Sequence, residues 1–151
     1  MLDNLINNIK KFGFENIFSK YYGRYLAKVS DTEDPKGLHQ VRIIVFAIDE
    51  TEPLPVWATY HSPWAGKGFG ANFPVRKDDL VWVTFEYGDL DFPVWHSGNF
   101  AEGDLPDEIK TNKQMGFVSR DSHYDVLGEE AKTWNRKMKE GNVLSFFEKV
   151  I

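Results

Sequence analysis

The sequence predicts an all-β fold built around one small barrel. Two segments rich in aromatic and β-branched residues, 22–30 and 39–47, are separated by Asp34, Pro35 and Gly37, which favour a turn. Three further strand-like segments follow, at 56–62, 80–87 and 92–100. No long helical period lies between them. Five short strands of this kind are typical of the OB-fold, a five-stranded antiparallel Greek-key barrel.

The barrel is expected to occupy residues 21–100, preceded by an N-terminal helical arm at residues 1–20. Apolar residues recur at helical spacing through residues 2–12, and Gly13 ends that pattern. The helix packs either on its own barrel or on a partner protein, and the sequence leaves both arrangements open.

Residues 101–151 are expected to form a C-terminal extension that begins with a linker. The composition predicts three elements after the linker: a hairpin at 115–126, a helix at 129–140 and a short apolar tail at 143–151. The hairpin turns at Arg120-Asp121-Ser122, and Gly141 ends the helix.

Composition and charge exclude several classes of protein. The chain has 151 residues, a formal net charge of −5 and no cysteine. Neither a disulfide framework nor a thiolate metal site can form without cysteine. No apolar run approaches the ~20 residues that a membrane-spanning helix needs, and polar residues interrupt any signal-peptide core at the N-terminus. The negative charge also argues against a nucleic-acid partner.

The residues that commonly carry catalysis are scattered. Eight acidic residues fall in predicted turns, where solvated acids are the ordinary case: Asp31, Glu33, Asp34, Asp49, Glu50, Glu52, Asp89 and Asp91. The four histidines, His39, His61, His96 and His123, lack the close spacing of a local metal site. We therefore expect no catalytic residue, no metal, no cofactor and no enzymatic activity.

Two of the predicted strands are apolar on both faces. One face of each strand belongs to the barrel core, and the predicted core is Ala27, Val29, Val41, Ile43, Val45, Val81, Val83 and Phe85. The apolar side chains of the other face must be shielded from water by another element, because a small barrel has only one interior. The flanking helices and a second subunit are both candidates for this cover.

A set of large apolar side chains is expected to contact other subunits or a hub protein. The residues are Ile44, Phe46, Trp64, Phe69, Trp82, Trp95, Trp134 and Met138. Two of them lie in the irregular segment 63–77, where alternating glycines make a helix improbable and allow close backbone contact with a neighbour.

A series of short motifs occurs in a specific order along the barrel. The motifs are Tyr22-Gly23-Arg24, Asp34-Pro35, Val41-Arg42-Ile43, Pro55-Val56-Trp57-Ala58, Phe73-Pro74, Val81-Trp82-Val83-Thr84-Phe85, Gly88-Asp89 and Pro93-Val94. In this order they resemble the OB-fold module of contractile-tail central spike proteins, a family that includes phage baseplate spikes and the VgrG proteins of type VI secretion.

The resemblance implies a structural baseplate protein found in the virion and made in the host cytoplasm. It implies a homotrimer at the tip of the tail tube, contacting hub and tail-tube proteins and, transiently, the host envelope. Residues 113–151 would then continue along the trimer axis, with Trp134, Met138 and 143–151 facing inward. The sequence shows no lysozyme-like domain, long β-helix or His-x-His tip motif, so a separate spike-tip protein is expected.

Two other functions remain as alternatives. An OB-fold can bind single-stranded nucleic acid by stacking bases on aromatic rings, and Trp57, Tyr60, Trp82 and Trp95 are the candidates for such stacking. The second alternative is an enzyme that acts on peptidoglycan, although no catalytic constellation supports it.

Overall fold

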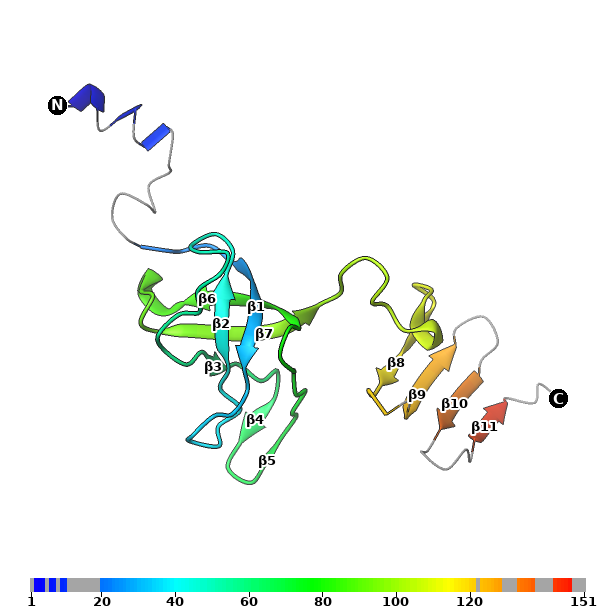
Figure 1. The fold of residues 1–151 in the computed structure, drawn as a ribbon. Helices are drawn as coiled ribbons and strands as arrows, with labels where there is room; N and C mark the ends of the chain where they lie inside the picture. The colour runs from blue at the N-terminus through cyan, green and yellow to red at the C-terminus, as the bar shows by residue number, and fades with distance from the viewer. Residues whose placement is uncertain are drawn as a thin grey trace. The chain divides into compact units, whose positions relative to one another are not determined.

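The computed structural model divides the chain into two compact units, Met1–Asn99 and Phe100–Ile151. It describes residues 2–4, 6–7, 9–10, 20–121, 123–128, 133–137 and 143–147. The described residues between 2 and 10 are helical. The rest of the fold is mostly β-structure (Figure 1).

The first unit is organised by a five-stranded sheet. Its strands are β1 (Tyr25–Asp31), β2 (Arg42–Val45), β3 (Thr59–Tyr60), β6 (Leu80–Phe85) and β7 (Pro93–Asn99). They lie in the order β2-β1-β6-β7-β3 (Figure 1). The sheet curls until its two edges meet, because Val41, directly before β2, forms an antiparallel bridge with Ala58, directly before β3.

The prediction of a wholly antiparallel barrel is wrong for one pair of strands. β3 and β7 run parallel, whereas the other neighbouring strands of this sheet run antiparallel. The reason is geometric: a ring with an odd number of strands cannot alternate in direction all the way round. In this five-stranded ring, the parallel pair lies where β7 meets β3.

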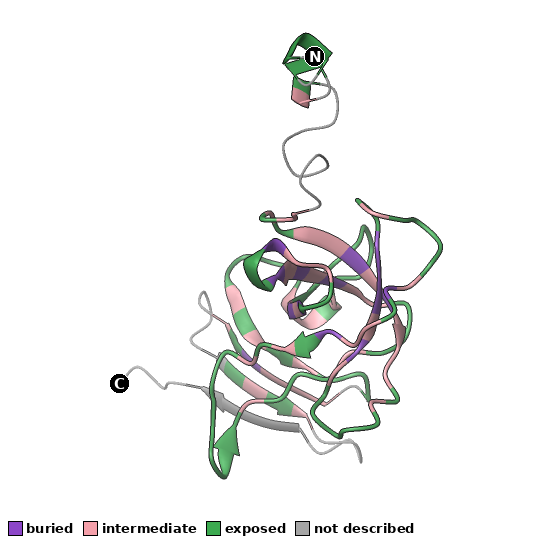
Figure 2. Cartoon of the chain, turned by 90° about the vertical axis from the view of Figure 1, so that its left-hand side faces the viewer, coloured by how far each residue is buried: buried purple, intermediate pink, exposed green. Residues whose placement is uncertain are grey.

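The core of the first unit confirms the predicted inner faces. All eight predicted core residues are buried, and they alternate along β1 and β6 as a half-buried sheet requires. Leu54, Ala58 and Trp95 complete this cluster, and sequence analysis did not place them there. The buried positions lie mainly in the strands of this unit (Figure 2).

Segment 63–77 contains no helix, as the sequence predicted. It holds a short ribbon instead, formed by β4 (Ala65–Gly66) and β5 (Phe69–Gly70), which pair antiparallel. Gly68, in the turn between them, has a φ of +80°, which glycine adopts without the strain that a Cβ would cause. A 3-10 turn, η1 (Glu86–Gly88), joins β6 to the loop before β7.

The second unit is a four-stranded antiparallel sheet. Its elements are η2 (Asp107–Ile109), β8 (Gln114–Val118), β9 (Tyr124–Gly128), β10 (Thr133–Lys137) and β11 (Val143–Phe147). Strands that are consecutive in the chain are neighbours in this sheet, whose order is β11-β10-β9-β8. β8 and β9 lie where the sequence predicted a hairpin, and the Ser119 N–H donates to the His123 carbonyl at 2.7 Å across their turn.

The helix predicted at 129–140 is wrong for its described residues. Residues 133–137 form β10, which pairs with β9 on one side and β11 on the other. The helical spacing of Ala131, Trp134 and Met138 led to the helix prediction, and the residues 133–137 themselves, with Trp134 as their one apolar side chain, carry no strand alternation. Hydrogen bonding to two neighbouring strands overrides the local helical preference. The apolar tail likewise contributes a strand, β11.

Acidic residues hold the turns of the first unit through hydrogen bonds to backbone N–H groups. The Asp34 carboxylate accepts from Lys36 at 2.8 Å, Leu38 at 2.6 Å and Gln40 at 3.1 Å. Asp49 accepts from the backbone of Thr51 and Glu52. These contacts are Asx-type turns, which satisfy backbone donors where the chain reverses direction.

Replacing Phe85 by alanine should destabilise the first unit strongly. Phe85 is buried, and its ring lies 5.9 Å from that of Tyr21 and 5.7 Å from that of Tyr25. Phe→Ala changes in a core cost about 3–5 kcal/mol, so we expect a lower denaturation midpoint. Phe92→Ala is the control, because Phe92 is exposed. Equal midpoints for the two variants would contradict the core assignment.

The Asp34 turn should make stability depend on pH on the acid side. Partial desolvation raises the pKa of Asp34, but the hydrogen bonds from Lys36, Gln40 and Leu38 outweigh it and lower the pKa overall. A lowered folded-state pKa contributes stability above the unfolded pKa, and this contribution is lost as the pH falls through the folded pKa. Asp34→Ala should lower stability at pH 7 and reduce its acid dependence, measured by urea denaturation. Glu33→Ala, at an exposed neighbour, should leave both quantities unchanged.

Candidate functional site

One face of the second-unit sheet carries exposed apolar side chains. The strand register places Met115, Leu127 and Trp134 directly opposite one another, and Phe117 lies on the same face two residues along β8. Their exposed fractions are 69%, 45%, 36% and 68%, in the order Met115, Leu127, Trp134 and Phe117. We call these four residues the apolar sheet face. Exposed apolar patches of this kind are common at sites of interaction.

A polar group lies within this face. Arg136 forms an ion pair with Asp125, its Nε donating at 3.0 Å, and Trp134 Nε1 also donates to the Asp125 carboxylate. These hydrogen bonds, from Trp134 first and Arg136 second, hold the pKa of Asp125 below its usual value. The Arg136 guanidinium also lies 5.1 Å from the centroid of the Trp134 ring. The group fixes the orientation of the Trp134 side chain at the surface.

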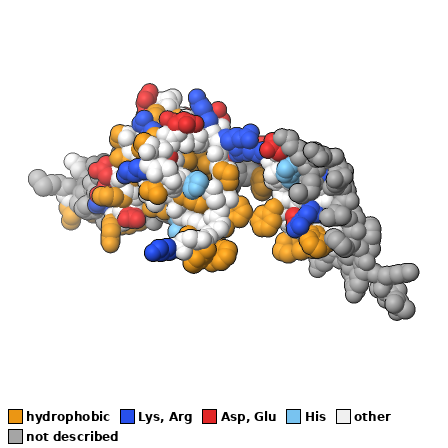
Figure 3. All heavy atoms as spheres, turned by 90° about the horizontal axis from the view of Figure 1, so that it is seen from below, with side chains coloured by type: hydrophobic (Ala, Val, Ile, Leu, Met, Phe, Trp, Pro, Cys, Tyr) orange, Lys and Arg blue, Asp and Glu red, His pale blue; other side chains and the backbone are white. Residues whose placement is uncertain are grey.

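A second apolar surface lies on the β4–β5 ribbon. The rings of Trp64 and Phe69 are 5.4 Å apart and are 62% and 54% exposed. The Phe69 ring lies where a side chain on Gly66 would be, so that glycine allows the ring to fold over the ribbon. On the face seen in Figure 3, hydrophobic side chains form separate clusters at the molecular surface. Trp64 and Phe69 are therefore accessible at the surface of the ribbon, and their role in a contact stays a prediction.

Two predicted contact residues are buried within the chain. Trp95 is only 2% exposed, its Nε1 donates to the His39 carbonyl at 3.1 Å, and its ring stacks on Tyr60 at 4.2 Å. It belongs to the core, so its assignment to an interface is wrong. Ile44 is 8% exposed and leaves little surface for a partner. The alternation of β7 turns Trp95 inward.

The other predicted contact residues differ in accessibility. Phe46 is 37% exposed. Trp82 is half-buried, with the Arg24 guanidinium 6.0 Å from its ring centroid. Trp134 belongs to the apolar sheet face, and Met138 lies outside the described residues.

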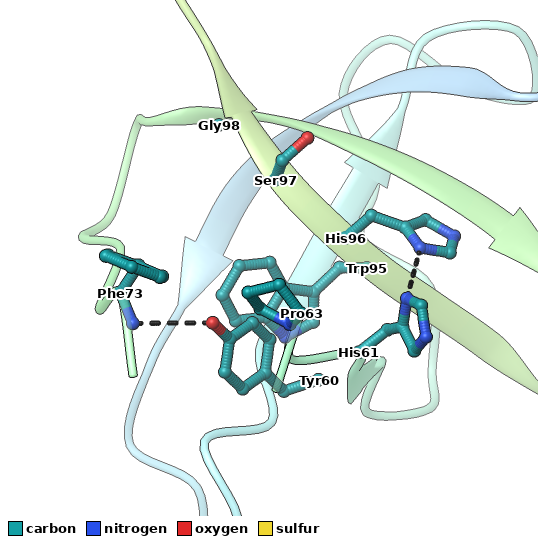
Figure 4. Close-up of a pocket in the computed structure, with 8 residues that line it drawn as sticks. All are labelled: Tyr60, His61, Pro63, Phe73, Trp95, His96, Ser97 and Gly98. Atoms are coloured by element: carbon teal, nitrogen blue, oxygen red, sulfur yellow. Dashed lines mark hydrogen bonds between the residues drawn. The ribbon is translucent and has the colours of Figure 1, made fainter. Parts of the chain in front are cut away.

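The parallel pairing of β3 and β7 brings two histidines together. Tyr60 is in register with Trp95, so the next residues along each strand, His61 and His96, also lie side by side. The His61 N–H donates to the Trp95 carbonyl at 2.9 Å and continues the pairing. The two Nδ1 atoms are 3.0 Å apart, with the ring planes at 81° (Figure 4).

The histidine pair lies at the edge of an apolar cavity of about 480 Å³. Tyr60, Pro63 and Phe73 line the same cavity, and the Phe73 N–H donates to the Tyr60 hydroxyl at 3.3 Å (Figure 4). His96 Nε2 is 2.6 Å from the Thr84 hydroxyl on β6. Burial, then His61 and then Arg24 lower the pKa of His96, so this ring remains neutral at physiological pH.

Among the residues that the structure describes, no group of three or more histidine, aspartate or glutamate side chains could hold a metal ion. In the same part of the chain, no helix is long and apolar enough to cross a membrane.

Comparison with known families identifies the first unit. The model of the type VI secretion system and phage-baseplate injector OB domain matches residues 25–100. The chain belongs to this family. None of the curated proteins compared matches the chain.

The match to the injector OB domain begins at the first residue of β1 and ends one residue after β7. It therefore covers the curled sheet and leaves all of the second unit outside except its first residue, Phe100. Membership confirms the resemblance seen in the sequence. It supports a structural role related to the spike of a phage baseplate or type VI secretion system, and a location in the virion tail in the phage case.

Sequence analysis missed the histidine pair, although the sequence held a signal for it. Tyr60-His61-Ser62 and Trp95-His96-Ser97 each read aromatic, histidine, serine. The parallel pairing of β3 and β7 places these two repeats side by side. The spacing of histidines along the chain could not reveal this pair, because His61 and His96 are 35 positions apart.

Proposed function

We propose that this injector OB protein forms a homotrimer that acts as a structural adaptor at the tip of a contractile tail tube, between hub proteins and a separate spike-tip protein. Family membership supports the location. The apolar sheet face carries the proposal of self-association, because a single-layer sheet cannot bury its own apolar side chains.

The burial of the second unit argues for association. Val126 is the only buried residue among those whose side chains are described in this unit. A stable sheet packs one face on another layer, and the layer that would cover Met115, Phe117 and Leu127 does not come from the described residues of this unit. Equivalent strands of two further copies provide such a layer, and cyclic symmetry places identical apolar faces around one axis.

The first unit supplies a different surface to the assembly. Phe46, Trp64 and Phe69 are exposed on a unit that already has its own core. Aromatic side chains of this kind are enriched where proteins contact one another. We assign them to contacts with the hub or a neighbouring protomer. Trp82, half-buried beside Arg24, lies at the margin of such a contact.

The proposed role involves no catalysis and no nucleic acid. Several carboxylates, such as Asp34 and Asp49, hold turns through backbone hydrogen bonds. Of the four aromatic residues considered for base stacking, Trp95 is buried. The adaptor works through rigidity and matched symmetry, and it takes part in penetration of the cell envelope by holding the spike tip on the tube.

The full-length chain should sediment at three times its mass of 17.5 kDa at micromolar concentration. Met115→Asp combined with Leu127→Asp should shift the particle to the monomer mass, because charges buried without partners oppose association. Leu38→Asp is the matched control, since Leu38 is 61% exposed on the first unit. This control should remain a trimer.

Near-ultraviolet circular dichroism should be retained in the double variant, because the core around Trp95 lies in the first unit. A wild-type chain that sediments as a monomer would overturn the trimer. A double variant that remains a trimer would show that the apolar sheet face is not the interface.

A further inference from the structure

We propose that His61 and His96 form a binding site for a divalent late transition-metal ion, with Cu²⁺ preferred over Ni²⁺ and Zn²⁺. The ion would be held between the two facing Nδ1 atoms. The proposal concerns the first unit alone and does not depend on the trimer.

The distance between the two nitrogens suits a shared metal ion. Imidazole nitrogens bind such metals at about 2.0–2.1 Å, so two ligands at right angles on one ion lie about 2.9 Å apart. The observed Nδ1–Nδ1 distance is 3.0 Å. Figure 4 shows both rings on the same side of β7, with these nitrogens facing each other. A modest rotation of the rings is enough to direct both lone pairs at one ion.

The strands hold one half of the site rigidly. His96 lies within β7, and its pairing with β6 places Thr84 against the outer nitrogen of the ring at 2.6 Å. Histidine ligands commonly donate this second N–H to an oxygen acceptor, which fixes the tautomer and the ring orientation. In the metal-bound form, His96 Nε2–H donates to the Thr84 hydroxyl oxygen and Nδ1 carries the free lone pair.

Proton positions in the pair are compatible with metal binding. Two neutral rings at this distance share one hydrogen bond, in which one Nδ1–H donates to the other Nδ1. Metal binding requires that the donor ring moves this proton to its own Nε2. Neutral imidazole is the ligand form.

The chemistry of the donors selects the metal. Two nitrogens and no carboxylate suit copper, nickel and zinc rather than magnesium or calcium. Affinities for such donors follow the Irving–Williams order, which places Cu²⁺ first. No third histidine or acidic residue joins the pair among the described residues. The remaining coordination positions are therefore taken by water or by a donor from another molecule.

Titration of the full-length protein with CuCl₂ in a non-coordinating buffer at pH 7.5 should show one ion per chain by isothermal calorimetry. Electron paramagnetic resonance should show two equivalent nitrogen ligands. NiCl₂ and ZnCl₂ should bind more weakly at the same site, and MgCl₂ should not bind.

His61→Gln and His96→Gln should each abolish this binding. Thr84→Val should weaken it by about 10- to 100-fold through loss of the outer hydrogen bond. His39→Asn is the matched control: it removes one histidine near Tyr60 and keeps a residue that tolerates the φ of +58° there. This control should bind as the wild type does.

Two results would overturn the proposal. The first is no copper binding to the wild-type protein at millimolar concentration. The second is equal binding by the wild type and by both glutamine variants, which would place any ion at other groups. Circular dichroism of each variant establishes that the fold is intact.

Discussion

The closure of a five-stranded ring is the constraint on which the first unit depends. Five strands cannot alternate in direction around a ring, so one neighbouring pair must be parallel, and here it is β3 with β7. The Val41–Ala58 bridge completes the ring on the other side of β3. This pairing stacks Tyr60 on Trp95 inside and places His61 beside His96 at the surface. One closing interaction therefore determines part of the core and the candidate metal site together.

The two units bury apolar surface in different ways. The first has a core that includes strands, loop residues and one tryptophan, and it exposes aromatic residues on the β4–β5 ribbon and after β2. The second is a single four-stranded layer in which a row of apolar side chains remains exposed. The first unit therefore has its own core, and the exposed aromatic residues lie outside that core. A sheet of one layer depends for its stability on another layer that packs on its apolar face.

Three aspartates of the first unit have a structural role in turns. Asp34, Asp49 and Asp89 each accept backbone N–H groups at a change of chain direction. A carboxylate in such a turn is favoured in its charged form. The hydrogen bonds of these three carboxylates therefore stabilise the loops of the first unit.

The sequence by itself determined the β-class, the family, the turns and the inner faces of β1, β2 and β6. These follow from local chemistry: alternation of apolar residues, and aspartate, proline and glycine at turns. Only the tertiary structure decided the parallel pair, the burial of Trp95, the meeting of His61 and His96, and the strand at 133–137. Each of these depends on strand neighbours that are distant in the sequence or on competition between local preference and sheet pairing. Spacing along one chain carries little information about such partners, because hydrogen bonds across a sheet are set by topology.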